Sequence, residues 1–292
     1  MKLPAACVVL ALALTAVAGC TKKEDTQPPV ATATFSASRA RAPLGSPLDL
    51  TYRFVVAANA PAFDKDYRVL VHFLDSDEQL MWTDDHFPPT PTSDWKPGQR
   101  IEYTHMMFVP QYPYMGEAII RIGLYDPETG ERLPLGGEND GQRAYKAGTL
   151  ELLPASDNVF IQFKDGWHNA EVAAENAQIE WQWTKKTATL SLRNPRRDAT
   201  FFLHFDARPD LVPGQTVTVR IGDQVLDTIA LESTDEVIRR IPITAAQFGD
   251  TENVDLTVEV NQAFVPAQTP AAKSQDPREL GIRVFHAFIE PK

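Results

Sequence analysis

The tryptophans are the side chains of this sequence whose type and spacing most favour ligand binding. Trp167, Trp181 and Trp183 lie within one short segment, and Trp95 lies in the proline-rich loop PTSDWKPG. Sugars present flat faces of C–H groups, so an indole ring edged by polar side chains is a common platform for them. We therefore predict glycan contacts at these four rings, with His168 as a polar partner and with an acidic rim that disfavours anionic polymers.

The same rings also have a structural interpretation. Trp181 and Trp183 are two residues apart, so in a strand they share one face, and at least one of them is expected to be core. Trp95 could close the end of a β-sandwich as a plug. The sequence leaves both roles open.

Histidines and carboxylates in the first half of the chain could bind a metal only if the fold gathers them. The candidates are His72, Asp84, Asp85, His86 and His105. They lack zinc-type spacing such as H-E-x-x-H, and DSDEQ lacks the pattern of a calcium loop. No glycine-rich phosphate loop is present. We predict no metal site and no cofactor.

The first twenty residues differ from the rest of the chain. Lys2 gives a positive start, and residues 5–17 are almost wholly apolar. This run is too short to span a bilayer, which takes about 20 apolar residues, and it is typical of the apolar region of a signal peptide. We predict a signal peptide over residues 1–19.

The leader ends in VAGC, which resembles the lipobox of bacterial lipoproteins. The resemblance implies that Cys20 becomes the N-terminus and carries the acyl chains, palmitate included, that anchor the protein in a membrane. Thr21 follows instead of Asp, which by the sorting rule of Gram-negative lipoproteins implies the outer membrane. The alternative is an ordinary secretory signal with a chance cysteine.

Motifs for nucleophilic catalysis are missing. There is no G-x-S-x-G elbow, Cys7 lies in the predicted signal peptide, and lipidation would consume the thiol of Cys20. We predict that the protein is not an enzyme. The alternative is a glycan hydrolase, which needs two carboxylates about 5 to 10 Å apart in a cleft.

The charge of the chain excludes several partners. It has 39 Asp and Glu residues against 28 Lys and Arg residues, and its formal net charge is −11. Nucleic-acid binding depends on basic patches, and attraction to anionic lipid depends on polybasic segments. We predict no nucleic-acid partner, and contact with a membrane only through the lipid anchor.

Strand patterns fill the chain beyond the leader. In LDLTYRFVV, apolar Leu48, Leu50 and Tyr52 alternate with polar residues, which is the period of a half-buried strand. About seven strands in the first part indicate an immunoglobulin-like sandwich, and about eight in the second part indicate a jelly-roll-like sandwich. The predicted fold class is all-β, with two antiparallel β-sandwich domains.

The predicted domain boundaries fall in the segments between these strands. Residues 20–34 contain a Pro-Pro pair and form a flexible tether behind the lipidated cysteine. The first sandwich is expected over residues 35–153, a linker over 154–158, and the second sandwich over 159–292.

Local motifs predict particular contacts. TAAQFG predicts a single helical turn with Thr244 as N-cap, and NAEVAAENAQ is a weak helix candidate by propensity. DPETGER predicts a tight turn in which Arg132 returns to Asp126. DPREL predicts a clamp between Asp276 and Arg278.

Two groups of motifs resemble known β-sandwich modules. VHFLD, PTSDWKPG and GLYDPETGERL, within residues 68–135, resemble the domains appended outside the membrane to bacterial glycosyltransferases of the mannosyltransferase type. DGWHNAE, IEWQW, FVP and DPRELGIRV are similar to a module of bacterial surface-glycan proteins. The positions that carry this second resemblance are Gly166, Trp167, Glu171, Trp183, Pro266, Asp276, Arg278, Leu280 and Gly281. The sequence lacks the catalytic and membrane-spanning parts of the glycosyltransferases, so we expect no transferase activity.

These observations predict a lipid-anchored, extracytoplasmic, non-catalytic protein that binds or helps organise surface polysaccharide. One alternative is a structural or adhesion subunit that binds another envelope protein. The other is the glycan hydrolase.

Overall fold

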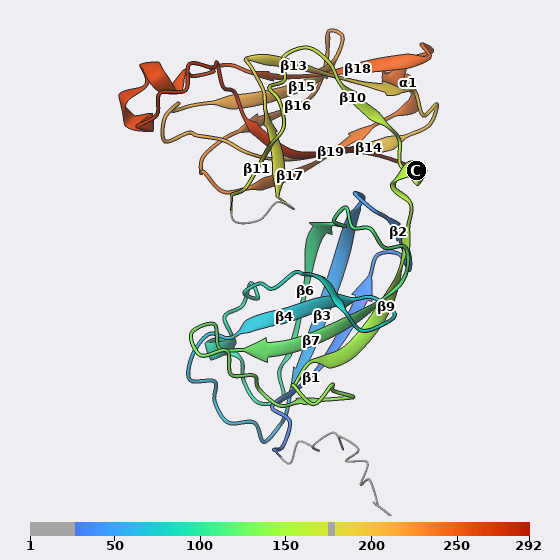
Figure 1. The fold of residues 1–292 in the computed structure, drawn as a ribbon, viewed down its shortest axis with the longest axis vertical. Helices are drawn as coiled ribbons and strands as arrows, with labels where there is room; N and C mark the ends of the chain where they lie inside the picture. Colours follow the sequence, from blue (N-terminus) through green and yellow to red (C-terminus); the bar gives the residue numbers. More distant parts are fainter. Residues whose placement is uncertain (1–26, 175–178) are drawn as a thin grey trace, which may run out of the picture.

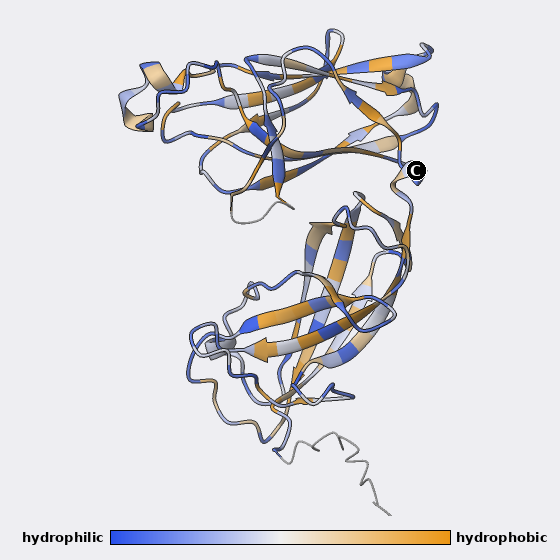
Figure 2. Cartoon of the chain, in the orientation of Figure 1, coloured by the Kyte–Doolittle hydropathy of each residue, from blue (hydrophilic) through white to orange (hydrophobic). Residues whose placement is uncertain are grey.

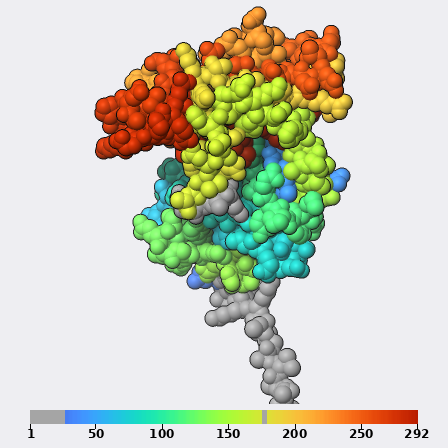
Figure 3. Space-filling view, turned by 45° about the horizontal axis from the view of Figure 1, so that its top comes forward, coloured from blue at the N-terminus to red at the C-terminus, as the bar shows by residue number. Residues whose placement is uncertain are grey.

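A computed structural model describes residues 27–174 and 179–292 and shows two successive β-sandwiches (Figure 1). The predicted all-β fold class is confirmed. Figure 3 shows the second sandwich, coloured yellow to red, lying over the first, coloured blue to green. None of the helices in the described residues is long and apolar enough to cross a membrane.

The first sandwich pairs a four-stranded sheet, in the order β6-β3-β1-β8, with a five-stranded sheet, in the order β2-β9-β7-β4-β5. A 3-10 turn, η1 (Thr92–Asp94), lies between β5 and β6. The strands are β1 (Ala31–Ala37), β2 (Arg41–Pro43), β3 (Pro47–Val56), β4 (Arg68–Leu74), β5 (Leu80–Thr83), β6 (Arg100–Phe108), β7 (Gly116–Tyr125), β8 (Leu135–Gly136) and β9 (Tyr145–Leu153).

The second sandwich pairs two five-stranded sheets, β10-β13-β18-β15-β16 and β11-β12-β19-β14-β17. Its helical segments are α1 (Ala245–Phe248), η3 (Pro266–Gln268) and η4 (Pro270–Ala272), and η2 (Ala155–Asp157) lies in the linker. The strands are β10 (Ile161–Phe163), β11 (Glu171–Val172), β12 (Glu180–Trp183), β13 (Thr187–Arg193), β14 (Ala199–Asp206), β15 (Thr216–Ile221), β16 (Gln224–Ala230), β17 (Val237–Ile243), β18 (Asn253–Val260) and β19 (Arg283–Pro291).

The alternation read from the sequence sets the inner face of β3. Leu48, Leu50, Tyr52 and Phe54 are each at most 1% exposed, and they pack against apolar residues of the opposite sheet. Figure 2 shows the resulting mixture of hydrophobic and hydrophilic positions along the strands. Burial of this face stabilises the sandwich by about 25 cal/mol for each Å² of apolar surface removed from water.

The start of the first sandwich corrects the predicted tether. The sequence predicts residues 31–34 as part of the tether, but β1 begins at Ala31 and pairs antiparallel with β3 up to Ala37. Small side chains gave the segment a weak apolar signal, although backbone pairing does not require large ones. Two pairs also depart from the predicted antiparallel order, because β1 runs parallel to β8 and β2 runs parallel to β9.

The second sandwich follows the sequence pattern at β13 and at α1. Ala188, Leu190 and Leu192 of β13 are buried. The single helical turn is confirmed, with a capping box in which Thr244 and Gln247 each bond the other's backbone N–H. A capping box satisfies two backbone donors that a helix start would leave unpaired.

Two local predictions are wrong. The expected helix begins instead as strand β11, and residues 175–178 lie outside the described residues. Asp126 does not pair with Arg132: it accepts a hydrogen bond from Lys65 Nζ at 2.8 Å, while Arg132 donates to the Gln142 carbonyl oxygen at 2.9 Å. Lys65 is 61 residues before Asp126 in the sequence and lies in another loop. The residues of the DPETGER motif alone therefore could not predict this partner.

The two sandwiches contact each other through side chains beside the linker. Phe108 of β6 stacks on His286 of β19, with ring centroids 4.2 Å apart. Arg240 Nη1 donates to Asp49 Oδ2 at 3.0 Å. Phe108 also lies in an apolar cluster with Phe202 and Phe288. Arg39 Nη1 also donates to Glu290 Oε1 at 2.5 Å. The contact therefore combines a small apolar centre with two ion pairs across it.

Candidate functional site

Trp95 lies in the core of the first sandwich, which corrects its assignment to a glycan site. It is 1% exposed, and its indole N–H donates to the Thr90 carbonyl oxygen at 3.0 Å. Its ring contacts Phe54, with centroids 5.1 Å apart. A ring with no exposed face cannot stack on a sugar, so Trp95 has a packing role.

The three tryptophans of the second sandwich are half-buried, and each ring meets a different phenylalanine and neither of the other two indoles among the described residues. The Trp167 indole N–H donates to the Thr189 carbonyl oxygen at 2.8 Å, and the ring packs against the core. Trp183 packs instead on an apolar cluster of Val212, Phe264 and Leu280. The two rings contribute to different parts of the packing.

Trp181 lies on the outer face of the sheet that contains β12. The guanidinium carbon of Arg283 is 4.9 Å from its ring centroid, and Phe285 meets it edge to face at 6.4 Å. Arg283 is in turn ion-paired with Asp206. The ring is thus covered in part by a cation–π contact within the protein.

Three of the nine residues that carry the second resemblance, Glu171, Asp276 and Arg278, meet in a clamp in the second sandwich. Arg278 Nε donates to Asp276 Oδ1 at 3.0 Å, which confirms the predicted clamp. Arg278 Nη1 also donates to Glu171 Oε1 at 2.6 Å. His168 Nε2 lies 2.7 Å from the Glu279 carbonyl oxygen and so bonds to the same loop. These contacts give the clamp a structural role.

The histidines and carboxylates of the first sandwich gather only in part. His105 Nε2 lies 3.3 Å from Asp84 Oδ1, and this hydrogen bond raises the pKa of His105. His86 stacks on His105 at 4.8 Å and bonds the Tyr103 hydroxyl at 2.7 Å, and burial lowers the pKa of His86. Asp85 instead accepts the Val71 backbone N–H at 2.8 Å.

The cluster has little free ligating capacity, because both ring nitrogens of His86 are already hydrogen-bonded. His72 lies elsewhere on β4, half-buried, and burial lowers its pKa. Within residues 27–174 and 179–292, no group of three or more His, Cys, Asp or Glu side chains could hold a metal ion.

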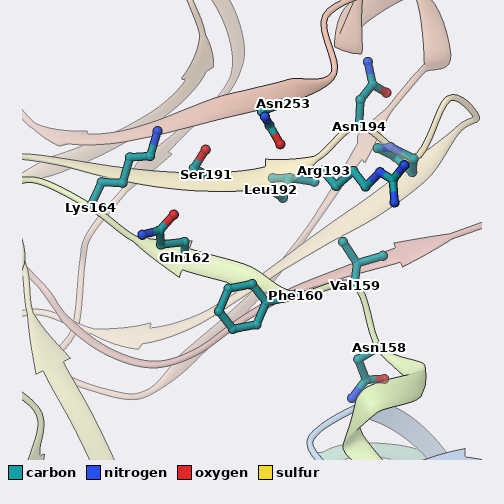
Figure 4. Close-up of a pocket in the computed structure, with 11 residues that line it drawn as sticks. Asn158, Val159, Phe160, Gln162, Lys164, Ser191, Leu192, Arg193, Asn194 and Asn253 are labelled. Carbon is teal, nitrogen blue, oxygen red and sulfur yellow. The ribbon is translucent and has the colours of Figure 1, made fainter.

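A groove of about 530 Å³ lies over the sheet β10-β13-β18-β15-β16, at the end next to the linker. Figure 4 shows polar side chains from β10, β13 and the start of β18 along it. The volume is in the range of small-ligand sites, about 300–1,000 Å³. The lining residues are Asn158, Val159, Phe160, Gln162, Lys164, Ser191, Leu192, Arg193, Asn194, Pro195 and Asn253.

Strand register places the polar side chains of the groove on one face. Gln162 pairs with Ser191 across β10 and β13, and Arg193 pairs with Asn253 across β13 and β18. Paired residues in a sheet point to the same side. Since Leu192, between Ser191 and Arg193, is buried in the core, the polar row faces outward.

A charge network supports the floor of this row. Lys164 Nζ lies 3.3 Å from Asp255 Oδ1. The pKa of Asp255 is lowered by a hydrogen bond from the Ser191 side chain and by the nearby Lys164. Asn194 donates to the carbonyl oxygens of Gly249 and Thr251 and so holds the turn at the groove's end.

None of the residues predicted from the sequence to bind glycan lines this groove, and Phe160 is its exposed aromatic residue. Phe160 is 80% exposed, the highest exposed fraction among the large apolar residues described. The signal was present in VFIQF, where Val159 and Ile161 alternate with Phe160 and Gln162. Val159 and Ile161 pack against the core, so period two sends Phe160 outward.

Comparisons with known proteins identify no family. No protein-family model matches the chain, and no curated protein matches it. Among solved structures it is similar to SGBP-B from a xyloglucan utilization locus in Bacteroides uniformis, with TM-score 0.34 and 8% identity over 90% of this chain and 74% of that one.

Two further structures match a smaller share of this chain. The C-terminal CBM6 of LamC from Zobellia galactanivorans has TM-score 0.27 and 10% identity, over 46% of this chain and 99% of that module. The glucuronidase BtGH115A has TM-score 0.33 and 15% identity, over 52% of this chain and 20% of that one.

Proposed function

We propose that the protein binds polysaccharide, without catalysis, through the groove of the second sandwich. The observation that carries this proposal is the exposed Phe160 ring beside a row of amide, hydroxyl and cationic side chains. An exposed aromatic ring loses unfavourable contact with water when a sugar face covers it. The neighbouring polar groups can donate to and accept from sugar hydroxyls.

The composition of the groove supports binding over hydrolysis. Glycoside hydrolysis uses two carboxyl groups that flank the scissile bond. None of the residues that line the groove is Asp or Glu. Asp255, which pairs with Ser191 across β13 and β18, is held by Ser191 and Lys164.

The proposal is tested by affinity gel electrophoresis of the full-length protein in gels that contain different neutral and acidic polysaccharides. Phe160→Ala should weaken binding about tenfold or more, as expected for loss of an aromatic anchor. Phe87→Ala is the matched control, because Phe87 is 55% exposed but lies on the first sandwich. Retardation by no polysaccharide, or equal retardation of wild type and Phe160→Ala, would contradict the proposal and favour a protein-binding subunit.

We also propose that Cys20 anchors the protein in the outer membrane. Cys20 lies outside the described residues, and the proposal rests on the VAGC motif and the apolar run before it. Cys20→Ser should remove the protein from the membrane fraction or leave it with an uncut leader and slower gel mobility. Unchanged fractionation together with unchanged mobility would exclude the anchor.

A further inference from the structure

Three neighbouring arginines beside the groove have no side-chain partner among the residues that the structure describes. Arg193 ends β13 and lines the groove, and Arg196 and Arg197 follow in the connection to β14. All three are exposed. Every other arginine of the chain donates a side-chain hydrogen bond or forms an ion pair.

Unpaired arginines are unexpected in a chain with formal net charge −11. Carboxylates are available nearby, since Asp250 and Glu252 are exposed in the segment before β18. Neither of them forms an ion pair with these arginines within the described residues. Asp198, which follows Arg197, accepts the Ala245 backbone N–H instead. Charges separated by more than about 8–10 Å are largely screened at physiological salt, so the distant acidic residues do not cancel three cations within five residues of the chain.

We propose that the groove binds a polysaccharide that contains uronic acid, with the sugar carboxylate held by Arg193. A guanidinium group presents parallel N–H donors that match a carboxylate. A uronic acid also offers a C–H face for Phe160, so one sugar type fits both features of the groove. This inference rests on the proposed function, and it contrasts with the acidic rim expected around the tryptophans.

The test is calorimetric titration of the full-length protein with oligogalacturonate and with its methyl ester, which keeps the ring and removes the charge. Wild-type protein should bind the acid about tenfold more tightly than the ester. Arg193→Gln should lose that preference and bind the ester unchanged, whereas Arg193→Lys should retain part of it. Arg41→Gln, which removes an exposed charge on the first sandwich, should behave as wild type.

Several outcomes would overturn the inference. Equal affinity of wild type for acid and ester would reject it while leaving polysaccharide binding intact. If Arg193→Gln and Arg41→Gln lose the preference for the acid equally, that preference depends only on the net charge of the protein. Dextran sulfate fragments that bind as tightly as the acid would lead to the same conclusion. Binding of neither sugar would reject this ligand class, and the Phe160→Ala comparison in different polysaccharides would then decide the proposed function separately.

Discussion

At the scale of single residues, the aromatic side chains of Trp95 and Phe160 have opposite surroundings. Trp95 comes directly after the 3-10 turn η1, and Phe160 comes shortly after the 3-10 turn η2. Trp95 is nevertheless 1% exposed, whereas Phe160 is 80% exposed. The difference lies in the partners: Trp95 meets Phe54 and Phe63 in the first core, whereas Phe160 has no ring neighbour among the described residues. Exposure therefore identifies the candidate ligand contact.

Trp95→Ala should destabilise the protein and leave glycan binding unchanged. Truncation of a buried tryptophan leaves a cavity in the first core, and such changes cost about 3–5 kcal/mol of the free energy of unfolding. Chemical denaturation, followed by affinity electrophoresis of the folded fraction, measures the two effects separately. A stable Trp95→Ala protein with weak glycan binding would return Trp95 to the site.

At the scale of elements, strands with large alternating side chains could be predicted and weakly apolar ones could not. The predictions of β3 and β13 are confirmed, because large apolar side chains alternate with polar ones and mark one face of each strand. The first four residues of β1, 31–34, are predicted as tether because alanine and threonine carry little of that signal, and pairing with β3 orders them instead.

The candidate site was less predictable than the strands. The outward direction of Phe160 follows from local alternation, but the groove needs β10, β13 and β18 side by side. Residues 162, 191 and 255 become neighbours only through register. No pattern within a single segment contains that information, so the sequence placed the site at the tryptophans.

The connection from β10 to β11 passes close to the backbone of β13 at Gly166. Gly166 has φ +85°, and a Cβ there would lie 1.9 Å from the Thr187 carbonyl oxygen. Gly166→Ala should therefore destabilise the protein by several kcal/mol more than Gly214→Ala. Gly214 is the matched control, since it has φ +74° with nothing within 4 Å of its added Cβ.

Thermal unfolding of both glycine variants checks this prediction. The control should show only the cost of alanine in a left-handed conformation, about 1 kcal/mol. Similar melting temperatures for the two variants would mean that this close approach yields easily, and that the clamp with Arg278 and Asp276 is held less rigidly than its contacts indicate.

At the scale of the whole molecule, the contact between the sandwiches contains a histidine pair. His204 Nδ1 and His286 Nδ1 lie 3.1 Å apart, and His204 Nε2 lies 2.8 Å from Glu236 Oε2. Phe108 of the first sandwich stacks on His286. In this hydrogen bond one Nδ1 atom donates and the other accepts. Because a protonated imidazole carries a hydrogen on both nitrogens, the two rings cannot both be protonated while the bond is present.

Acid should weaken this contact between the sandwiches. Burial, and then the nearby His204, lower the pKa of His286 from 6.5 to about 4. Between these values the unfolded chain binds more protons than the folded one, so stability is complete above about pH 6.5 and falls as the pH drops toward 4. The largest contribution from this group is about 3 kcal/mol.

His286→Phe should reduce that pH dependence, because phenylalanine keeps the stack on Phe108 and cannot be protonated. We expect the difference in unfolding free energy between pH 7.5 and pH 4.5 to be smaller in the variant than in wild type. Since Phe108 supplies part of the burial, small-angle X-ray scattering should also show a larger radius of gyration for wild type at pH 4.5 than at pH 7.5. Identical pH profiles for the two proteins would mean that the histidine pair does not couple protonation to the contact. The contact would then depend on the apolar cluster with Phe202 and Phe288 and on the Arg240–Asp49 and Arg39–Glu290 pairs.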